Sequence, residues 1–418
     1  MMHGFVIAVL LSFGPTVSNS FARFAYALVL PAMRMDLEMN YSQAGWLNTA
    51  NAIGYLAGAV LTWTLVRRTG NRLLFSLGMV ATTIALIATG LTHDLGWLTI
   101  ARMAAGIGGA MVFIAGGAMA GNIFPHRPEL ATATILLYFG GAGLGLMMSG
   151  VAIPLLLDSH GPQAWPLAWQ AMGWTSAVMT AASLAAAKRI VEPQSLLGGA
   201  SSWHLRDFTA QFLAYICFGL GYIAYMTFVI AWMRDNGSGT GEVVTVWFLL
   251  GLATLVAPAV WTRPCANWPG GRPLAAVMVV LSAGAMLPVV SAAPAVMIGS
   301  AVLFGLAGFS APSAISAFIR KALPKSAWGS AMATFTVAFA ASQIAGPVLT
   351  GWVADWSGSL RPGLMVSALV LMLGGLVALV QRDRVDQGQR PPSDPQLLTQ
   401  VDAPIGGGAS AAVRLRPK

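Results

Sequence analysis

Apolar stretches recur along nearly the whole chain, and each is long enough to cross the hydrocarbon core of a bilayer, which is about 30 Å thick. Of the 418 residues, 56% are hydrophobic and only 9% are charged. Soluble domains carry about 25% charged residues, so a soluble core could not bury this much apolar surface. The stretches predict twelve membrane-spanning helices, at roughly 5–31, 42–66, 73–91, 96–124, 131–157, 166–187, 209–233, 243–262, 274–292, 295–319, 327–353 and 362–381.

The first stretch begins close to Met1 and has neither a basic leader nor a compact cleavage site, so we expect a retained helix. Cys217 and Cys265 have no spacing that suggests a disulfide framework or a metal site. The five histidines all lie near a terminus or a connection, and no hydrolase or kinase constellation survives placement on the helices. We therefore expect no enzyme activity, no cofactor and no metal.

The net charge of +9 follows the membrane sides and does not indicate a nucleic-acid partner. Connections after even-numbered helices hold twelve basic residues, and the opposite connections hold only Arg34, Arg234 and Arg361. Lys and Arg are enriched in cytoplasmic loops. The pattern predicts a multi-pass protein of the bacterial inner membrane with both termini in the cytoplasm.

A polar connection with several glycines and serines divides the helices six and six. We predict an N-terminal bundle at 1–187, a linker at 188–208, a C-terminal bundle at 209–381 and a disordered cytoplasmic tail at 382–418. The halves repeat weakly at an offset of about 200 residues, as Gly106 and Gly305 illustrate. Two parallel halves place a substrate site between them, near the midplane.

The chain contains the short motifs Arg23-Phe24-Ala25-Tyr26, Gln43-Ala44-Gly45-Trp46-Leu47, Gly346-Pro347 and Gly351-Trp352-Val353-Ala354-Asp355. As a set, they resemble the major facilitator superfamily, in particular its YbfB/YjiJ-like subgroup. The resemblance covers about 5–381 and implies an all-α membrane protein of two pseudo-symmetric six-helix bundles. It also implies secondary transport by alternating access.

The loop between the second and third helices resembles the gating loop of this superfamily through Arg68, Gly70 and Arg72. Arg67 stands where the family has an acidic residue, which puts the family's gating salt bridge in doubt. Arg102, followed by Gly106, matches the fourth-helix motif. Small-residue pairs such as Gly54 and Gly58 lie inside apolar stretches, so we assign them to close helix packing.

All fourteen acidic residues fall in connections, helix ends or the tail, whereas Arg23 and Arg102 lie inside apolar stretches. A guanidinium at membrane depth is costly and usually faces a cavity or a partner, although backbone carbonyls could also satisfy it, and Arg102 could serve gating instead. Helical spacing puts Asn19, Arg23 and Tyr26 on one face and Asn48, Asn51 and Tyr55 on another. The predicted substrate-binding residues are Asn19, Arg23, Tyr26, Asn51, Arg102, Tyr222 and Gln343.

The planar fork of donors on a guanidinium suits a carboxylate or a phosphate, so the leading hypothesis is transport of a small organic anion. Efflux of amphipathic or cationic compounds and a transporter-like membrane sensor are the alternatives. The partners expected are a small-molecule substrate, a coupling ion and the lipid bilayer, and the protein is expected to be a monomer. Uptake and efflux both stay open.

Overall fold

The computed structural model describes residues 2–127, 130–192, 203–324 and 327–382. These residues are almost entirely helical, and none of them forms a strand. Of the predicted tail, only Arg382 is among the described residues. The middle of the predicted linker, 193–202, also lies outside them. We call 2–192 the first half and 203–382 the second half.

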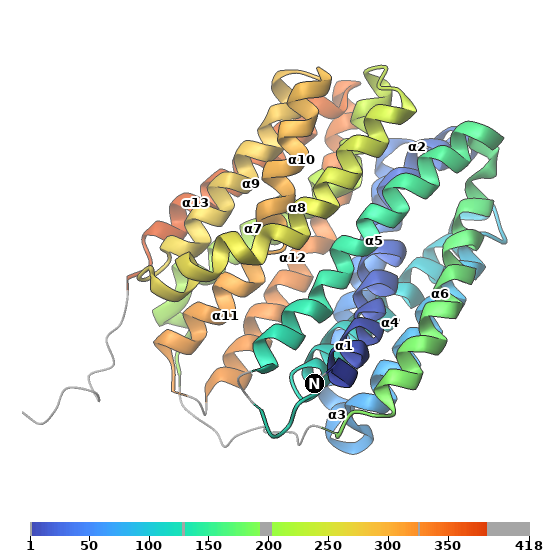
Figure 1. Cartoon of the computed structure of the whole chain (residues 1–418). Coiled ribbons are helices and arrows are strands. Elements are labelled where there is room, and N and C mark those ends of the chain that lie inside the picture. Colours follow the sequence, from blue (N-terminus) through green and yellow to red (C-terminus); the bar gives the residue numbers. More distant parts are fainter. Residues whose placement is uncertain (1, 128–129, 193–202, 325–326, 383–418) are drawn as a thin grey trace, which may run out of the picture. The chain divides into compact units, whose positions relative to one another are not determined.

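The first half begins with three helical segments in succession, α1 (Met2–Pro15), the π-helix η1 (Thr16–Phe24) and α2 (Tyr26–Asp36). After them come α3 (Tyr41–Thr89), α4 (Leu95–Ala120), α5 (Ala131–His160), the short η3 (Pro162–Ala164) and α6 (Trp165–Ala187). Figure 1 shows these elements in blue to green, with α5 and α6 running beside α1.

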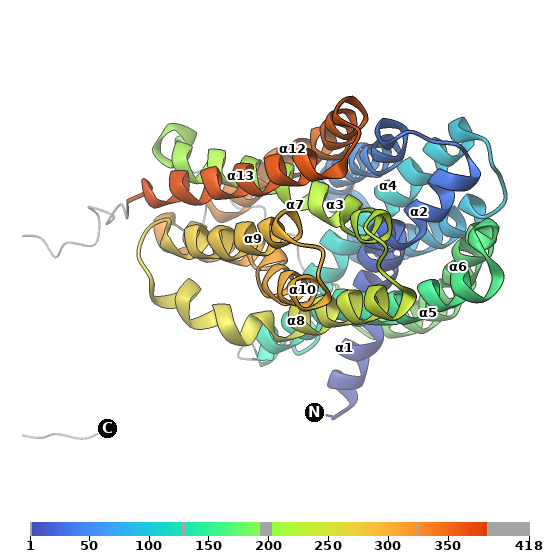
Figure 2. The ribbon, with the colours of Figure 1, turned by 90° about the horizontal axis from the view of Figure 1, so that it is seen from above.

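The second half begins with the short η4 (Leu205–Phe208). It continues with α7 (Thr209–Asp235), α8 (Thr240–Asn267), α9 (Arg272–Val290), α10 (Pro294–Gly308), α11 (Ala311–Ala322), α12 (Trp328–Ser357) and α13 (Leu360–Leu379). The halves meet where α3 packs on α12, α5 on α8 and α2 on α7. Figure 2, seen from above, shows α5 beside α8.

Ten helical segments of the described chain are long and apolar enough to cross a membrane. One of them, α3, is a merged pair of helices that is broken at Gly70, where φ is 77° and ψ is 165°. Glycine is favoured there because a side chain disfavours positive φ. The break falls between the predicted spans 42–66 and 73–91. The 23-residue α6 is not among the ten segments, and the count of twelve crossings stays a prediction.

Two predicted spans are not continuous α-helices. The span predicted at 5–31 is divided into α1, η1 and α2, and the span predicted at 295–319 is divided into α10 and α11 near Phe309. Pro312 in the first turn of α11 explains the second break, because proline lacks an N–H and clashes with the preceding turn. Apolar composition alone cannot distinguish these segments from one straight helix.

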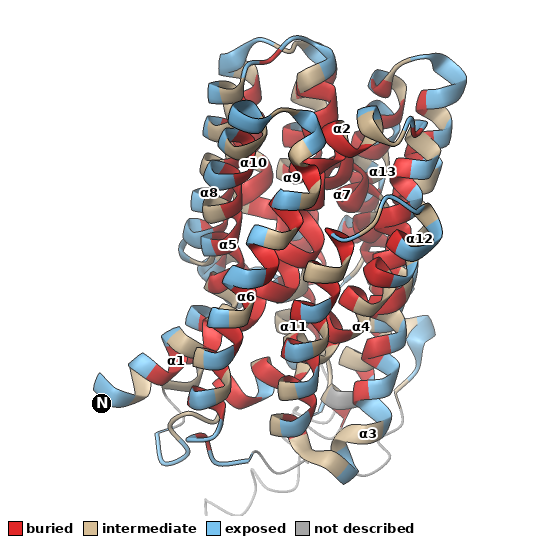
Figure 3. Cartoon of the chain, turned by 90° about the vertical axis from the view of Figure 1, so that its right-hand side faces the viewer, coloured by how far each residue is buried: buried red, intermediate tan, exposed pale blue. Residues whose placement is uncertain are grey.

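Close packing of α3 on α4 depends on two glycines. A Cβ at Gly54 would lie 2.0 Å from the Met103 carbonyl oxygen, and one at Gly58 would lie 2.3 Å from that of Ile107. The prediction that these glycines serve helix packing is confirmed. Figure 3 shows the buried residues along the inside of the bundle. The exposed apolar side chains include Trp63, Ile84 and Val178.

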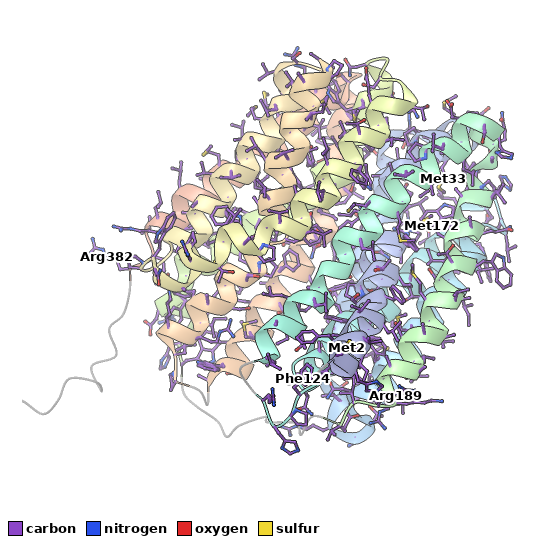
Figure 4. The ribbon with its side chains drawn as sticks, viewed as in Figure 1. Met2, Met33, Phe124, Met172, Arg189 and Arg382 are labelled. Carbon is purple, nitrogen blue, oxygen red and sulfur yellow. The ribbon has the colours of Figure 1, made fainter. Side chains whose placement is uncertain are left out.

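The two ends of the bundle carry different residues. Met2, Phe124 and Arg189 lie near one end, where the Phe5 and Phe124 rings are 5.4 Å apart, and Met33 lies toward the other end (Figure 4). The second end carries the connections that follow α2, α7 and α12. We call this second end the predicted outer end and define it by Tyr41, Asp235 and Asp355.

Candidate functional site between the halves

The π-helix in the middle of the first transmembrane segment positions Arg23. Nine residues, Thr16–Phe24, have π-helical geometry, and the Ala25 amide donates to the Ser20 carbonyl over 2.7 Å. Thr16 Oγ1 donates to the Gly141 carbonyl (2.8 Å) and Ser20 Oγ to the Ala142 carbonyl (2.5 Å), so hydroxyl groups fasten this segment to α5. Helical segments with π geometry are rare and frequently occur at functional sites.

Arg23 contacts both halves of the protein. Its Nη2 donates a hydrogen bond to Oε1 of Gln343 on α12, and its guanidinium carbon lies 5.0 Å from the centre of the Tyr55 ring. The side chain is only 5% exposed, and its buried Nε has no hydrogen-bond partner in the described part of the chain. No ion pair between described residues includes Arg23. The charge is therefore held by one neutral amide and by aromatic faces.

Arg102 lies inside the first half. Its Nη1 donates to the Ala22 carbonyl over 2.5 Å, and the guanidinium lies over the rings of Tyr26 (5.0 Å) and Trp169 (5.2 Å). Nε and Nη2 are buried and have no partner among the residues described. Like Arg23, Arg102 is not in an ion pair with any described residue. Two guanidinium groups thus lie in the interior with no carboxylate of the described residues paired to them.

Three of the predicted site residues are used by contacts within the first half. Tyr26 donates to the Ala44 carbonyl (2.7 Å), Asn51 Nδ2 donates to the Arg102 carbonyl (3.1 Å), and Asn19 Oδ1 accepts from Ser18 Oγ (3.2 Å). The predicted shared face of Asn19, Arg23 and Tyr26 assumed α-helical spacing. Winding through η1 is wider, and Tyr26 contacts Arg102 whereas Arg23 reaches α12.

Tyr222 belongs to an aromatic cluster of α7 and α12 that lies next to the Arg23 segment. Its ring is stacked on Phe218 with centroids 5.0 Å apart, and Phe218 is stacked on Phe339 at 5.3 Å. The Phe24 ring, adjacent in sequence to Arg23, meets Tyr222 edge-on at 6.2 Å. Of the predicted binding residues, the structure therefore brings Arg23, Gln343 and Tyr222 together. Tyr55, part of a predicted polar stripe, joins them.

The predicted gating loop has a carboxylate that the motif did not reveal. Glu192, which follows α6, accepts hydrogen bonds from the backbone N–H of Asn71 and, at 3.3 and 3.4 Å, from that of Arg72. The Arg72 side chain donates to the Ile190 carbonyl over 2.5 Å. Arg68 is exposed and makes no hydrogen bond with a described residue. Glu192 thus caps the helix that begins after Gly70.

Polar contacts join the halves at the predicted outer end. Asp355 of α12 accepts from the backbone N–H groups of Tyr41 and Ser42, both at 2.8 Å, and from Ser42 Oγ at 2.5 Å. The Tyr41 hydroxyl donates to Asp235, which also lies 3.6 Å from Arg34. A carboxylate in the last turn of a helix opposes the dipole of that helix. This contact was not predicted from the sequence, although an acidic residue in the last turn of a helix is a signal that could have indicated a partner elsewhere.

Further hydrogen bonds link the halves between Arg23 and this end. Asn48 Nδ2 donates to Thr227 Oγ1 (2.5 Å), and Thr49 Oγ1 donates to the Ile344 carbonyl (2.7 Å). Among described residues, the hydrogen bonds between the halves extend from Arg23 to Asp355, with Thr240 to Asp158 as a further contact at that end. No cluster of His, Cys, Asp or Glu within the described ranges could hold a metal ion.

Comparison with solved structures shows the fold. The D-xylose–proton symporter superposes with a TM-score of 0.70 at 13% identity, covering 89% of this chain and 96% of that one. The nucleoside transporter NupG gives 0.69 at 10% identity, with coverages of 90% and 99%. A bacterial homologue of the human lysosomal transporter Spinster, inward-facing and occupied, gives 0.67 at 15% identity, with coverages of 90% and 96%. Among curated proteins, no sequence matches the chain.

The predicted resemblance is confirmed by a family comparison. Residues 16–379 match the family described as "Uncharacterised MFS-type transporter YbfB". The match includes the π-helix, both buried arginines and the polar contacts at the predicted outer end. The all-α architecture and the solved relatives agree with it. The chain therefore belongs to the YbfB-like family of the major facilitator superfamily, whose members are membrane transporters.

Proposed function

We propose that this transporter moves a small organic anion across the bacterial inner membrane by alternating access. The single observation behind the anion assignment is Arg23, a buried guanidinium at the contact between the halves that is held by the neutral Gln343. In this proposal the bundles at 1–187 and 209–381 move against each other around that position. Both termini lie in the cytoplasm, and the monomer is the functional unit.

The energetic argument concerns the charge of Arg23. Placing an Arg inside a membrane costs about 2.5–3.5 kcal/mol on insertion scales, and a neutral amide recovers only part of this. A carboxylate or phosphate can form a bidentate, charge-assisted pair with the guanidinium fork, which is stronger than a hydrogen bond between neutral groups. The unpartnered Nε supplies a donor for such a pair. A neutral or cationic solute would leave this charge uncompensated.

The aromatic cluster supports a second candidate, efflux of amphipathic or cationic compounds. Tyr215 and Phe339 are stacked with centroids 5.1 Å apart, and Phe218 and Tyr222 extend the stack toward Arg23. Aromatic faces attract both apolar bodies and cations. A membrane sensor remains the non-transport alternative, because a carrier fold can bind a solute without moving it.

The deciding experiment is a substrate screen in proteoliposomes with wild type and two Arg23 variants. We expect accumulation of an organic anion, severe loss of its transport in Arg23→Gln, and a smaller loss in Arg23→Lys, which keeps the charge but not the fork. Arg263→Gln removes an exposed positive charge and is the control expected to transport normally. Membrane abundance should be equal in all four proteins.

Three results would contradict the proposal in different ways. Normal transport of the identified substrate by Arg23→Gln would eliminate the anion site. A substrate that proves cationic would favour the efflux alternative. Tight binding without flux under any imposed ion gradient would favour the sensor.

A further inference from the structure

Gln343 has a chemical group that matches the proposed substrate in shape but not in charge. A carboxamide and a carboxylate are both planar and nearly the same size, and each presents an oxygen acceptor. The carboxamide oxygen of Gln343 accepts from Arg23 Nη2, which is a position that an anionic oxygen would take. The side chain is fully buried, so water does not compete for this bond.

The orientation of the Gln343 amide is fixed by a second hydrogen bond. Its Nε2 donates to the Phe339 carbonyl, one turn earlier on α12, over 3.1 Å. With the nitrogen bound to its own helix, the oxygen is directed at Arg23. The amide is therefore part of α12, and its bond to Arg23 is a direct link between the halves.

We propose that the Gln343 carboxamide is an internal substitute for the substrate anion. It accepts the hydrogen bond of Arg23 when the carrier is empty, and it is displaced from Arg23 when the anion binds. This inference rests on the proposed anion function. It assigns Gln343 as a positioning residue that competes with the substrate, in contrast to a group that adds to substrate affinity.

Displacement of Gln343 has a consequence for the contact between the halves. The Arg23–Gln343 bond lies farthest from the predicted outer end in the series that continues with Asn48 to Thr227 and Thr49 to the Ile344 carbonyl. An anion on Arg23 frees α12 from the π-helix at this point. A ligand shifts a conformational equilibrium only by its differential affinity for the two states, and exchange of this bond is such a difference.

The first test uses the empty protein and needs no substrate. Gln343→Leu removes the carboxamide at similar volume and should shift the outer end toward separation by about tenfold, the lower range for a hydrogen bond to a charged group. Pulsed electron spin resonance between labels at Met35 and Asn236, both exposed, measures this separation. Gln170→Leu is the matched control, because Gln170 bonds the Gly90 carbonyl within the first half (2.9 Å).

The second test measures binding of benzoate, a probe with a carboxylate for Arg23 and a ring for the neighbouring aromatic faces. We expect Gln343→Leu to bind benzoate about tenfold more tightly than wild type, because no internal acceptor competes. Gln343→Glu places a carboxylate on Arg23 and should bind benzoate at least tenfold more weakly. In an Arg23→Gln background both differences should vanish, which a double-mutant cycle detects.

The outcomes separate this inference from the proposed function. If benzoate binding depends on Arg23 but Gln343→Leu binds it equally or more weakly, Gln343 is not a competitor and only the inference is overturned. Benzoate binding that is indifferent to Arg23→Gln overturns the anion site and the inference with it. The inference is also overturned if the Met35–Asn236 label distance in empty Gln343→Leu equals that in wild type. Absence of benzoate binding to both wild type and Gln343→Leu overturns it as well.

Discussion

Removing the Asp355 carboxylate should open the predicted outer end. Asp355 opposes the dipole of its own helix α12 but accepts three hydrogen bonds from the start of α3. Its stabilising contacts therefore exist only while the halves are closed at this end. In Asp355→Ala, α3 loses a cap supplied from the other half.

The magnitude follows from the exposure of the site. Loss of a helix cap costs about 0.5–2 kcal/mol, and exposed charges contribute about 1 kcal/mol or less. Asp355 is exposed, so we take about 1 kcal/mol, which shifts the ratio of closed to open molecules about fivefold. Asp355→Asn keeps an acceptor and should give a smaller shift.

Spin-label distance distributions between Met35 and Asn236 measure the shift, with Asp94→Ala as the matched control. Asp94 accepts from the Trp97 amide (2.7 Å) and caps α4 inside the first half, so its loss should destabilise the protein without opening this end. Equal distance distributions in wild type and Asp355→Ala would show that the contact of Asp355 with α3 does not hold the halves together. The same conclusion would follow if Asp355→Ala and Asp94→Ala opened this end equally.

Two further predictions concern packing and topology. In Gly45→Val, a Cβ 2.4 Å from the Pro347 carbonyl oxygen must push α3 and α12 apart, so the distance between the labels at Met35 and Asn236 should increase. Gly299→Val is the control, because its nearest neighbour is 3.6 Å away and the distance should not change. An unchanged distance in Gly45→Val would contradict the close contact of α3 and α12. Reporters fused at Asp158 and at the C-terminus should locate outside and inside, and an external C-terminus would refute the predicted orientation.

The sequence was informative where composition is decisive. Apolar stretches predicted most helices to within a few residues, and burial of Arg23 and Arg102 followed from their position inside such stretches. Gln343 was predicted as a binding residue, but its bond to Arg23 joins positions 320 residues apart, which no local pattern reports. Which residues of the two halves meet depends on how the helices pack, and in the sequence helix packing is indicated only by small residues at the contacts.

The π-helix shows why residue spacing failed at one point. Amphipathic spacing assumes 3.6 residues per turn, and the π-helix η1 departs from it. Two of its hydroxyls bond to α5 carbonyls. The stretch at 16–24 has no glycine or proline itself, but Gly14 and Pro15 directly precede it and were the available signal for a change of winding. Glu192 was missed for a related reason: it lies 121 residues from Asn71, beyond any loop motif.

Under the proposed anion function, the two buried guanidinium groups give the empty and the loaded carrier different charges in the interior. Arg23 and Arg102 are fixed positive charges within membrane-spanning helices, and no described carboxylate neutralises them. Moving one elementary charge through the full membrane potential involves about 2.3 kcal/mol per 100 mV. In the proposed cycle a monovalent anion on Arg23 cancels one of the two charges. On that proposal we expect the membrane voltage to act more strongly on the return of the empty carrier than on the movement of the loaded one.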